Sequence, residues 1–171
     1  MLKLETIGNR AFYLTPLKHI GDLRPLTTIG DYAFYSTQLE QLGDMEKLTT
    51  IGKYAFSGTT IKQLGDMQSL TTIGDYAFTG TPLAQLGDTS ALTTIGNFAF
   101  ANCRDLSVVR LPKTLEEVKK NAFLGLAGEI TVEPGDNFVC KCVHLAEKLK
   151  KITDVRLENK RNRTYRIKHD E

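Results

Sequence analysis

Residues 48–67 read LTTIGKYAFSGTTIKQLGDM, and this stretch decides the fold because close copies of it recur along the chain. When the copies are aligned, one phenylalanine column has spacings of 22, 22, 22, 22 and 23 residues. Its members are Phe12, Phe34, Phe56, Phe78, Phe100 and Phe123. Other apolar columns keep the same register, including one of Leu4, Leu26, Leu48, Leu70, Leu92 and Leu115 and one of Ile7, Ile29, Ile51, Ile73, Ile95 and Val118. This regularity indicates a repeat protein.

A unit of 22 residues with four or five apolar positions cannot close a core alone, but stacked units bury one another. We therefore predict an α/β solenoid, a right-handed coil of six 22–23-residue repeats over residues 1–124. Residues 38–42 and their counterparts are predicted to form short parallel strands, and residues 48–51 a second extended segment on the opposite side. Between these segments, residues 52–56 are predicted to form a short helical turn that Gly52 permits.

The pattern I-G-x-x-A-F followed by L-x-x-L resembles the BspA-like leucine-rich repeats of bacterial surface proteins and some protists, over residues 4–124. Cys103 and Pro112 fall where that family often has Cys and Pro, whereas the earlier copies have Thr and Gly-Asp there. The resemblance implies a curved solenoid used for adhesion or other protein contacts. It also implies a location at the cell surface or outside the cell.

Residues 125–171 break the period and are predicted to cap the C-terminal end of the solenoid. We expect a strand at 130–134, a short helix over 137–151, and a hairpin formed by 155–158 and 164–167. The N-terminal end lacks such a covering segment, so we expect another chain or an upstream segment to cover it. Residues 1–5 show no signal-peptide pattern, which keeps the cytoplasm as the alternative location.

Charge is distributed unevenly along a chain whose formal net charge is +2. Residues 148–171 hold nine Lys and Arg against four Asp and Glu, which leaves thirteen against sixteen in residues 1–147. The basic hairpin suggests an alternative function, the binding of nucleic acid or an anionic surface. We do not expect nucleic-acid binding, because basic residues that alternate with Val155, Leu157, Tyr165 and Ile167 are explained by a cap with one apolar side.

The leading candidate binding surface is the face of the first predicted strand ladder, since solenoids bind partners on extended faces. Its residues are Lys18, His19, Glu40, Gln41, Lys62, Gln63 and Gln85, continued by Ala84, Ser107 and Val108. The alternative is a solvated ladder of Gln side chains that bond to one another. A second candidate is an aromatic stripe of Tyr32, Tyr54, Tyr76 and Phe98, whose rings suit protein or sugar contacts but can also simply stack half-buried.

An acidic column of Asp22, Asp44, Asp66 and Asp88 also recurs. We expect each carboxylate to accept a backbone N–H in its own turn, with a bridging calcium ion as the lesser alternative. Cys140, Cys142 and His144 lie within five residues, but a closed zinc site needs a fourth ligand and no partner motif supplies one. Three cysteines cannot all pair within the chain, so no disulfide framework is implied.

No arrangement typical of catalysis stands out from the repeat, and no cofactor or metal is predicted. The acids and glycines recur because the backbone turn recurs. The sequence also lacks the 18 or more consecutive apolar residues of a membrane span. We therefore predict a non-catalytic protein-interaction module, with protein as the partner and carbohydrate as a second choice.

Overall fold

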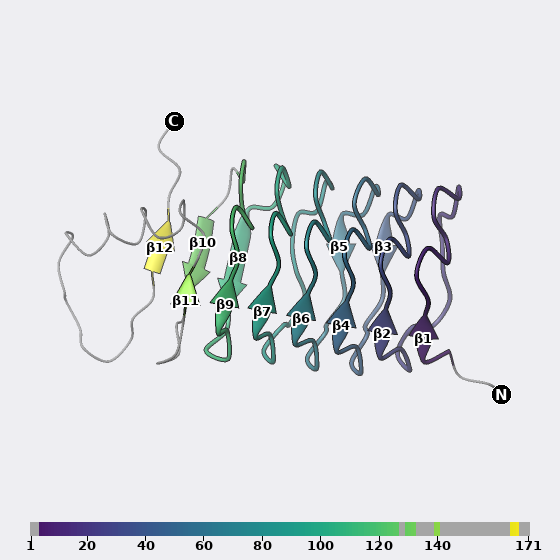
Figure 1. Cartoon of the computed structure of the whole chain (residues 1–171), viewed down its shortest axis with the longest axis horizontal. Helices are drawn as coiled ribbons and strands as arrows, with labels where there is room; N and C mark the ends of the chain where they lie inside the picture. The colour runs from purple at the N-terminus through teal and green to yellow at the C-terminus, as the bar shows by residue number, and fades with distance from the viewer. Residues whose placement is uncertain (1–3, 127–128, 133–138, 141–164, 168–171) are drawn as a thin grey trace.

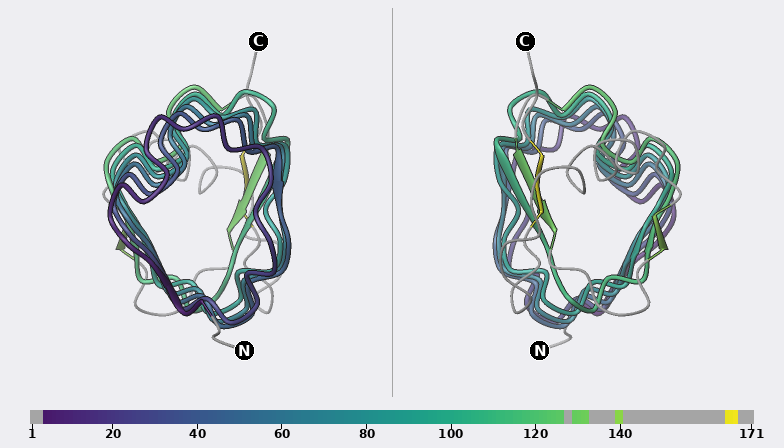
Figure 2. Two further views of the ribbon diagram at one scale, coloured as in Figure 1. Left: turned by 90° about the vertical axis from the view of Figure 1, so that its right-hand side faces the viewer. Right: turned by 90° about the vertical axis from the view of Figure 1, so that its left-hand side faces the viewer.

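The computed structural model describes residues 4–126, 129–132, 139–140 and 165–167. Successive coils stack along one axis, with the N-terminus at one end (Figure 1). Viewed along this axis, the described coils follow nearly the same path (Figure 2). We number the coils 1–6 from the aligned leucines at 4, 26, 48, 70, 92 and 115.

One side of the solenoid is a continuous parallel sheet of seven strands in the order β1-β2-β4-β6-β7-β9-β11. The strands are β1 (Thr6–Ile7), β2 (Thr28–Ile29), β4 (Thr50–Ile51), β6 (Thr72–Ile73), β7 (Thr94–Ile95), β9 (Glu117–Val118) and β11 (Val139–Cys140). The register pairs Thr with Thr and Ile with Ile from β1 to β7. The first six of these strands bury their Ile or Val, so the predicted second extended segment is confirmed in every coil.

The opposite side carries the first predicted ladder, but in two separate sheets. β3 (Gln41–Leu42) pairs in parallel with β5 (Gln63–Leu64), and Gln63 forms an isolated parallel bridge to Gln85. β8 (Val108–Leu111) pairs in parallel with β10 (Glu129–Val132), which pairs antiparallel with β12 (Tyr165–Ile167). Figure 1 shows these strands behind the continuous sheet. The prediction of parallel strands here is confirmed, although the ladder is interrupted between Gln85 and β8.

The segment predicted to be a helical turn is a series of β-turns, and the described residues contain no helix. Within residues 30–37, the odd-numbered amides from residue 33 onward donate to the carbonyl three residues earlier at 3.1–3.3 Å. The even-numbered amides from residue 32 onward donate instead to the next coil at 2.8–3.0 Å. A helix would keep every amide within its own segment. Half of these amides bond to the next coil instead, so the predicted helical turns are not confirmed.

Two positions in each turn segment have a left-handed backbone, and neither is the glycine predicted to permit the turn. The first column is Arg10, Tyr32, Tyr54, Tyr76, Phe98 and Asn121, and the second is Leu14, Ser36, Gly58, Gly80, Asn102 and Gly125. A left-handed conformation costs a non-glycine residue about 1–2 kcal/mol. The first column carries this conformational cost in every coil, and the contacts between stacked coils must offset it.

In coils 2–5, the glycine that follows the strand Ile is required by close approach of the coils. A Cβ placed on Gly74 would lie 2.7 Å from the Gly52 carbonyl carbon and the Lys53 amide nitrogen in the preceding coil. On Gly8, in the first coil, a Cβ would meet nothing within 4 Å. The predicted role of this glycine, freedom at a turn, is therefore corrected to clearance between backbones.

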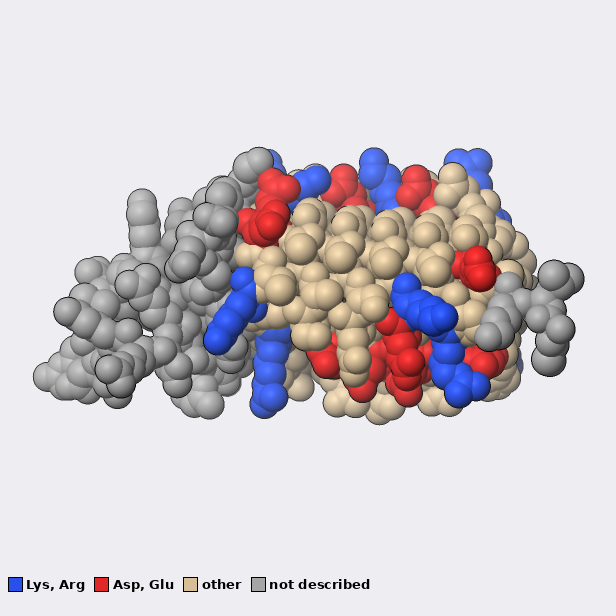
Figure 3. Space-filling model, turned by 90° about the horizontal axis from the view of Figure 1, so that it is seen from below, with Lys and Arg blue, Asp and Glu red and all other residues tan. Residues whose placement is uncertain are grey.

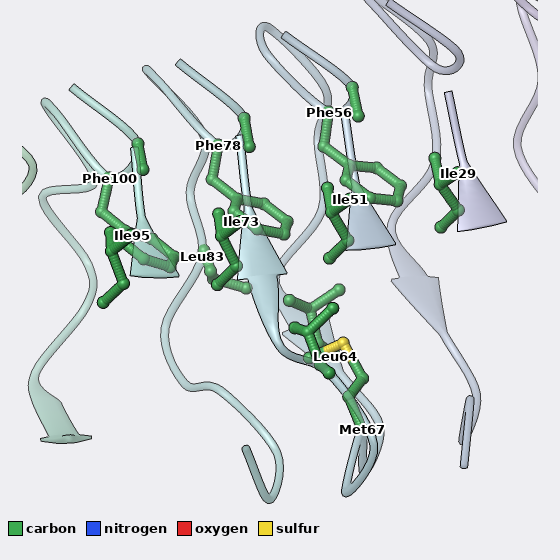
Figure 4. Packing of buried hydrophobic residues seen from close by; sticks show 14 of the residues in the cluster. Ile29, Ile51, Phe56, Leu64, Met67, Ile73, Phe78, Leu83, Ile95 and Phe100 are labelled. Atoms are coloured by element: carbon green, nitrogen blue, oxygen red, sulfur yellow. The ribbon is translucent and has the colours of Figure 1, made fainter. Parts of the chain in front are cut away.

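The core is one-dimensional, as predicted. Ring centroids of successive phenylalanines in the aligned column lie 5.1–5.3 Å apart with interplanar angles of 10° or less. Phe34, Phe56, Phe78 and Phe100 are completely buried. Figure 4 shows Phe56, Phe78 and Phe100 repeating beside Ile51, Ile73 and Ile95, each ring above the same position in the next coil. Burial of large apolar side chains at this density is the main stabilising term of the fold.

The C-terminal region is described only in its strands. β10 confirms the predicted strand near 130–134, and β11 lies where a helix over 137–151 was predicted, so that prediction is wrong at Val139–Cys140. Pairing with β9 extends the sheet there in place of helix. β12 confirms the second strand of the predicted hairpin, but its observed partner is β10. The remaining residues of the predicted helix, hairpin and cap lie outside the described residues.

Candidate functional site

The predicted strand face is a solvent-exposed strip along the side that carries β3 and β5. All seven predicted contact residues are exposed: Lys18, His19, Glu40, Gln41, Lys62, Gln63 and Gln85. Pairing places Gln41 opposite Gln63 and Gln63 opposite Gln85, which forms an in-register row of amide side chains. Of the continuing residues, Ser107 and Val108 are exposed and Ala84 is half-buried. We call the seven residues the Gln-row face.

The side chains of the Gln-row face have no partners among the described residues. The alternative, a ladder of Gln amides bonded to one another, is not seen, since within the described part of the chain no side-chain hydrogen bond joins Gln41, Gln63 and Gln85. Lys18, Glu40 and Lys62 alternate in sign, yet the only ion pair within the described residues joins Arg24 and Asp22. Every polar group of the face is thus open to an external partner.

The predicted aromatic stripe is present, but its rings stack on one another. Tyr32, Tyr54, Tyr76 and Phe98 are half-buried and stack in sequence at centroid distances of 4.8, 4.6 and 5.0 Å. Sugar contacts on aromatic side chains use an exposed ring face. Within the stripe both faces of Tyr54 and Tyr76 are covered by neighbouring rings, which leaves only edges and hydroxyl groups for a ligand.

At its N-terminal end the stripe widens into a cluster. Tyr13 stacks on Tyr35 at 5.2 Å, and the Arg10 guanidinium lies 5.6 Å from the centre of the Tyr32 ring. Partial burial is the main cause that raises the pKa of Tyr54 above its ordinary value, with neighbouring Tyr76 adding to it. The stripe therefore behaves chiefly as a half-buried packing layer, the alternative that the sequence left open.

The acidic column is engaged by backbone amides. The Asp44 carboxylate accepts the amide of Asp66 at 3.0 Å, and that of Asp66 accepts the amide of Asp88 at 2.8 Å. Asp22 and Asp88 instead accept amides two residues ahead, from Arg24 and Ser90. The expected bond in the same turn is thus correct for the two end members only, while the middle members bind the next coil. One oxygen of each carboxylate accepts a backbone amide, in its own turn or from the next coil, and no calcium is needed to explain the column.

A row of threonine side chains is likewise bonded within the stack. The hydroxyls of Thr27, Thr49, Thr71 and Thr93 each donate to a carbonyl of the preceding coil at 2.9–3.0 Å. A hydroxyl whose proton is already donated within the stack offers little to a partner.

Seen from below, the surface has a band without charged side chains along the axis, and acidic side chains gather beside it with Lys and Arg at their borders (Figure 3).

Cysteine chemistry and metal binding find no support in the described part of the chain. Cys103 is buried and its Sγ donates to the Phe78 carbonyl oxygen at 3.0 Å. Burial raises the pKa of the Cys103 thiol, which keeps it protonated and unreactive. No group of three His, Cys, Asp or Glu that could hold a metal occurs among the described residues. Cys142 and His144 lie outside them.

A groove of about 750 Å³ opens where the Gln-row face meets coil 5, and the sequence analysis missed it. It is lined by residues 85–90 of coil 4, by Leu64 and Asp66 of coil 3, and by Val108, Arg110, Leu111 and Pro112 of coil 5. Gln85 belongs both to the groove and to the Gln-row face.

Two residues explain why the coils separate at the groove. In the glycine column of this turn, a Cβ on Gly87 would lie 2.2 Å from the Gly65 carbonyl oxygen, so these coils touch only because glycine is there. Coil 5 has Arg110 at this position and cannot approach as closely. The replacement of Gly-Asp by Arg-Leu-Pro was the sequence signal that could have located the groove.

The residues behind the alternative function are mostly undescribed. Of the basic hairpin, only Tyr165–Ile167 falls within the described residues, as β12. Lys160, Arg161 and Arg163 lie outside them, so nucleic-acid binding stays a prediction that we do not favour. The described residues also include no helix of a length and hydropathy that could cross a membrane.

Comparison with known proteins gave one match. A family model described as the BspA type leucine-rich repeat region, with 6 copies, matches residues 5–129. No curated protein and no solved structure matches the chain. The match covers all six coils and extends into β10, where the stack continues beyond the last complete repeat.

Proposed function

We propose, from the premise that this chain belongs to the BspA-type leucine-rich repeat family, that it is a non-catalytic module for adhesion or recognition. Its partner is a protein and its contact surface is the Gln-row face. A leucine-rich repeat solenoid is a typical protein-interaction scaffold, because stacking produces a long, rigid surface at low cost per repeat.

One observation carries the proposal: the Gln-row face is the part of the repeat whose side chains the stack does not use. The aspartate column, the threonine row and the aromatic stripe all have partners within the protein, in the same turn or in a neighbouring coil. The amides of Gln41, Gln63 and Gln85 are exposed and in register. Amide side chains both donate and accept hydrogen bonds, so they suit the polar parts of a protein interface.

The absence of catalysis in the proposal rests on how the recurring acids are used. Each aspartate of the acidic column accepts a backbone amide, which is a structural role repeated coil after coil. A catalytic carboxylate has instead to be singled out by an environment that differs from its counterparts. Carbohydrate is the second choice of ligand, and the stacked aromatic stripe offers it few free ring faces.

The test compares two variants with the same chemical change in different places. Gln41→Arg with Gln63→Arg places two bulky charges on the Gln-row face, whereas Gln38→Arg with Gln68→Arg places them on exposed residues outside it. Proteins captured from an extract of the source organism are identified by mass spectrometry for the wild type and both variants. We expect a partner that the first variant loses and the second retains. Equal capture by both variants would remove the Gln-row face as the contact surface.

A further inference from the structure

The groove between coils 4 and 5 differs in chemistry from the rest of the Gln-row face. Its apolar part is formed by half-buried Leu86 and by Val108, which is 48% exposed although it is a large aliphatic side chain. Pro112 continues this apolar surface. An exposed aliphatic side chain beside a half-buried one is a typical receptor for an apolar side chain of a partner.

The acidic end of the groove is formed by Asp66 and Asp88. Both are exposed, and each uses only one carboxylate oxygen, Oδ1, for a backbone amide. Neither forms an ion pair within the described residues. Two neighbouring negative charges without a counter-ion favour a cationic side chain. Arg110, on the coil 5 wall, disfavours a second cation and so selects against a run of basic residues.

One backbone donor along the groove is also free. In coil 3 the amide of Met67 donates to the carbonyl oxygen of Asp88 in the next coil at 2.8 Å. The corresponding amide in coil 4, that of Thr89, has no hydrogen-bond partner among the described residues. Buried or half-buried amides without partners are costly, so an incoming peptide carbonyl is favoured there.

We propose that this groove binds an extended peptide segment of a partner protein that carries one Lys or Arg and, two residues along, a large aliphatic side chain. The inference deepens the proposed function, on which it rests, by naming the chemistry of one contact site. In an extended chain, residues two apart point to the same side and lie about 6.6 Å apart. That arrangement brings the cation to Asp66 and Asp88 while the aliphatic side chain lies on Leu86 and Val108.

The experiment uses the whole chain and a defined probe. The probe is the acetylated and amidated peptide Ser-Lys-Ser-Leu-Ser, followed by NMR through the methyl signals of Leu86 and Val108. The register control is Ser-Lys-Leu-Ser-Ser, in which the two side chains point to opposite sides. The charge control is Ser-Glu-Ser-Leu-Ser. We expect the probe to shift both methyl signals and the register control to bind at least about tenfold more weakly, because it loses burial of the Leu side chain.

Variants of the protein locate the site. Asp88→Asn keeps the acceptor for the Ser90 amide but removes a charge, and should weaken the probe about two- to fivefold. Val108→Lys should abolish binding, since it replaces the apolar wall by a cation. Asp44→Asn is the matched control: it belongs to the same acidic column two coils away and should leave the affinity unchanged.

The inference is overturned if the probe shifts neither methyl signal, if the two peptides of different register bind equally, or if Asp44→Asn weakens binding as much as Asp88→Asn. Its failure is separable from that of the proposed function. A partner that Val108→Lys retains but Gln41→Arg with Gln63→Arg loses would leave the Gln-row face in place and remove the groove. Loss with Val108→Lys alone would support the groove and move the contact surface to it.

Discussion

Two columns of aromatic rings run along this solenoid, two residues apart in the turn segments of coils 2–5. The Phe column stacks inside, with Phe34 and Phe56 5.1 Å apart, and the Tyr column stacks outside, with Tyr54 and Tyr76 4.6 Å apart. Both have nearly parallel rings. Phe34, Phe56, Phe78 and Phe100 of the inner column are completely buried, whereas the outer rings are half-buried and belong to residues with a left-handed backbone. Repetition alone therefore brings rings to stacking distance, while the burial of the rings decides how much each column stabilises the fold.

The largest expected effect comes from deleting one inner ring. Phe56→Ala should lower the free energy of unfolding by about 3–5 kcal/mol, because it leaves a cavity between Phe34 and Phe78 that the coils cannot close. Urea unfolding followed by circular dichroism measures this. Wild-type stability in the variant would show that the inner column does not support the core.

The second test concerns the spacing that both columns share. Gly74→Ala should cost about 1–3 kcal/mol, because its Cβ would press against the backbone of Gly52 and Lys53 and force the coils apart. Gly8→Ala is the matched control in the same column, where a Cβ meets nothing within 4 Å. It should be neutral or slightly stabilising, since alanine restricts the unfolded chain. Equal losses from thermal unfolding of the two variants would argue against clearance between coils as the reason for the glycine.

Deleting one outer ring should have a smaller effect. Tyr54→Ala removes stacking with Tyr32 and Tyr76 and should cost about 1–2 kcal/mol, clearly less than Phe56→Ala. Tyr54→Asn separates the energetic effect of losing the ring from that of the left-handed backbone. Asparagine tolerates this conformation, and Asn121 occupies the position in coil 6. The asparagine variant should therefore be the more stable of the two in urea unfolding. The reverse order would mean that the left-handed backbone carries no cost at this position.

The smallest expected effect is at the threonine column that ends each turn segment. The Thr59 hydroxyl donates to the Phe56 carbonyl at 2.8 Å, but the buried hydroxyl of Thr37 has no partner among the described residues. Thr59→Val should cost about 1 kcal/mol, whereas Thr37→Val should be neutral or stabilising, because it removes an unsatisfied polar group. Calorimetry of the two variants compares them directly. A loss at Thr37 equal to that at Thr59 would show that its hydroxyl is bonded in solution.

Much of the fold follows from residue spacing. The period of 22 residues predicts that Phe56 lies against Phe34 and Phe78, and that Thr50 and Ile51 pair with their counterparts, whatever the details of the coil. The exposed positions of the Gln-row face follow equally, since alternation along a strand places Gln41 outward when Leu42 is inward. Periodicity determines which residues stack and which side they face.

What the period does not contain is the distance between coils and the direction of each hydrogen bond. The pattern Gly52–Phe56 was consistent with a helical turn, and only the stacked backbone shows that half of its amides bond to the next coil. The role of Gly74 likewise appears only when Gly52 lies beside it.

The groove is the clearest case of a feature that tertiary structure alone decides. The sequence shows that Arg110 replaces the glycine found in the other coils. That replacement predicts a groove only when the close approach of Gly87 to Gly65 is known. The sequence by itself determined the repeat, the core columns and the outward face, because these depend on spacing. The tertiary structure decided the turn geometry, the glycine clearances and the groove, because these depend on how closely two backbones can approach.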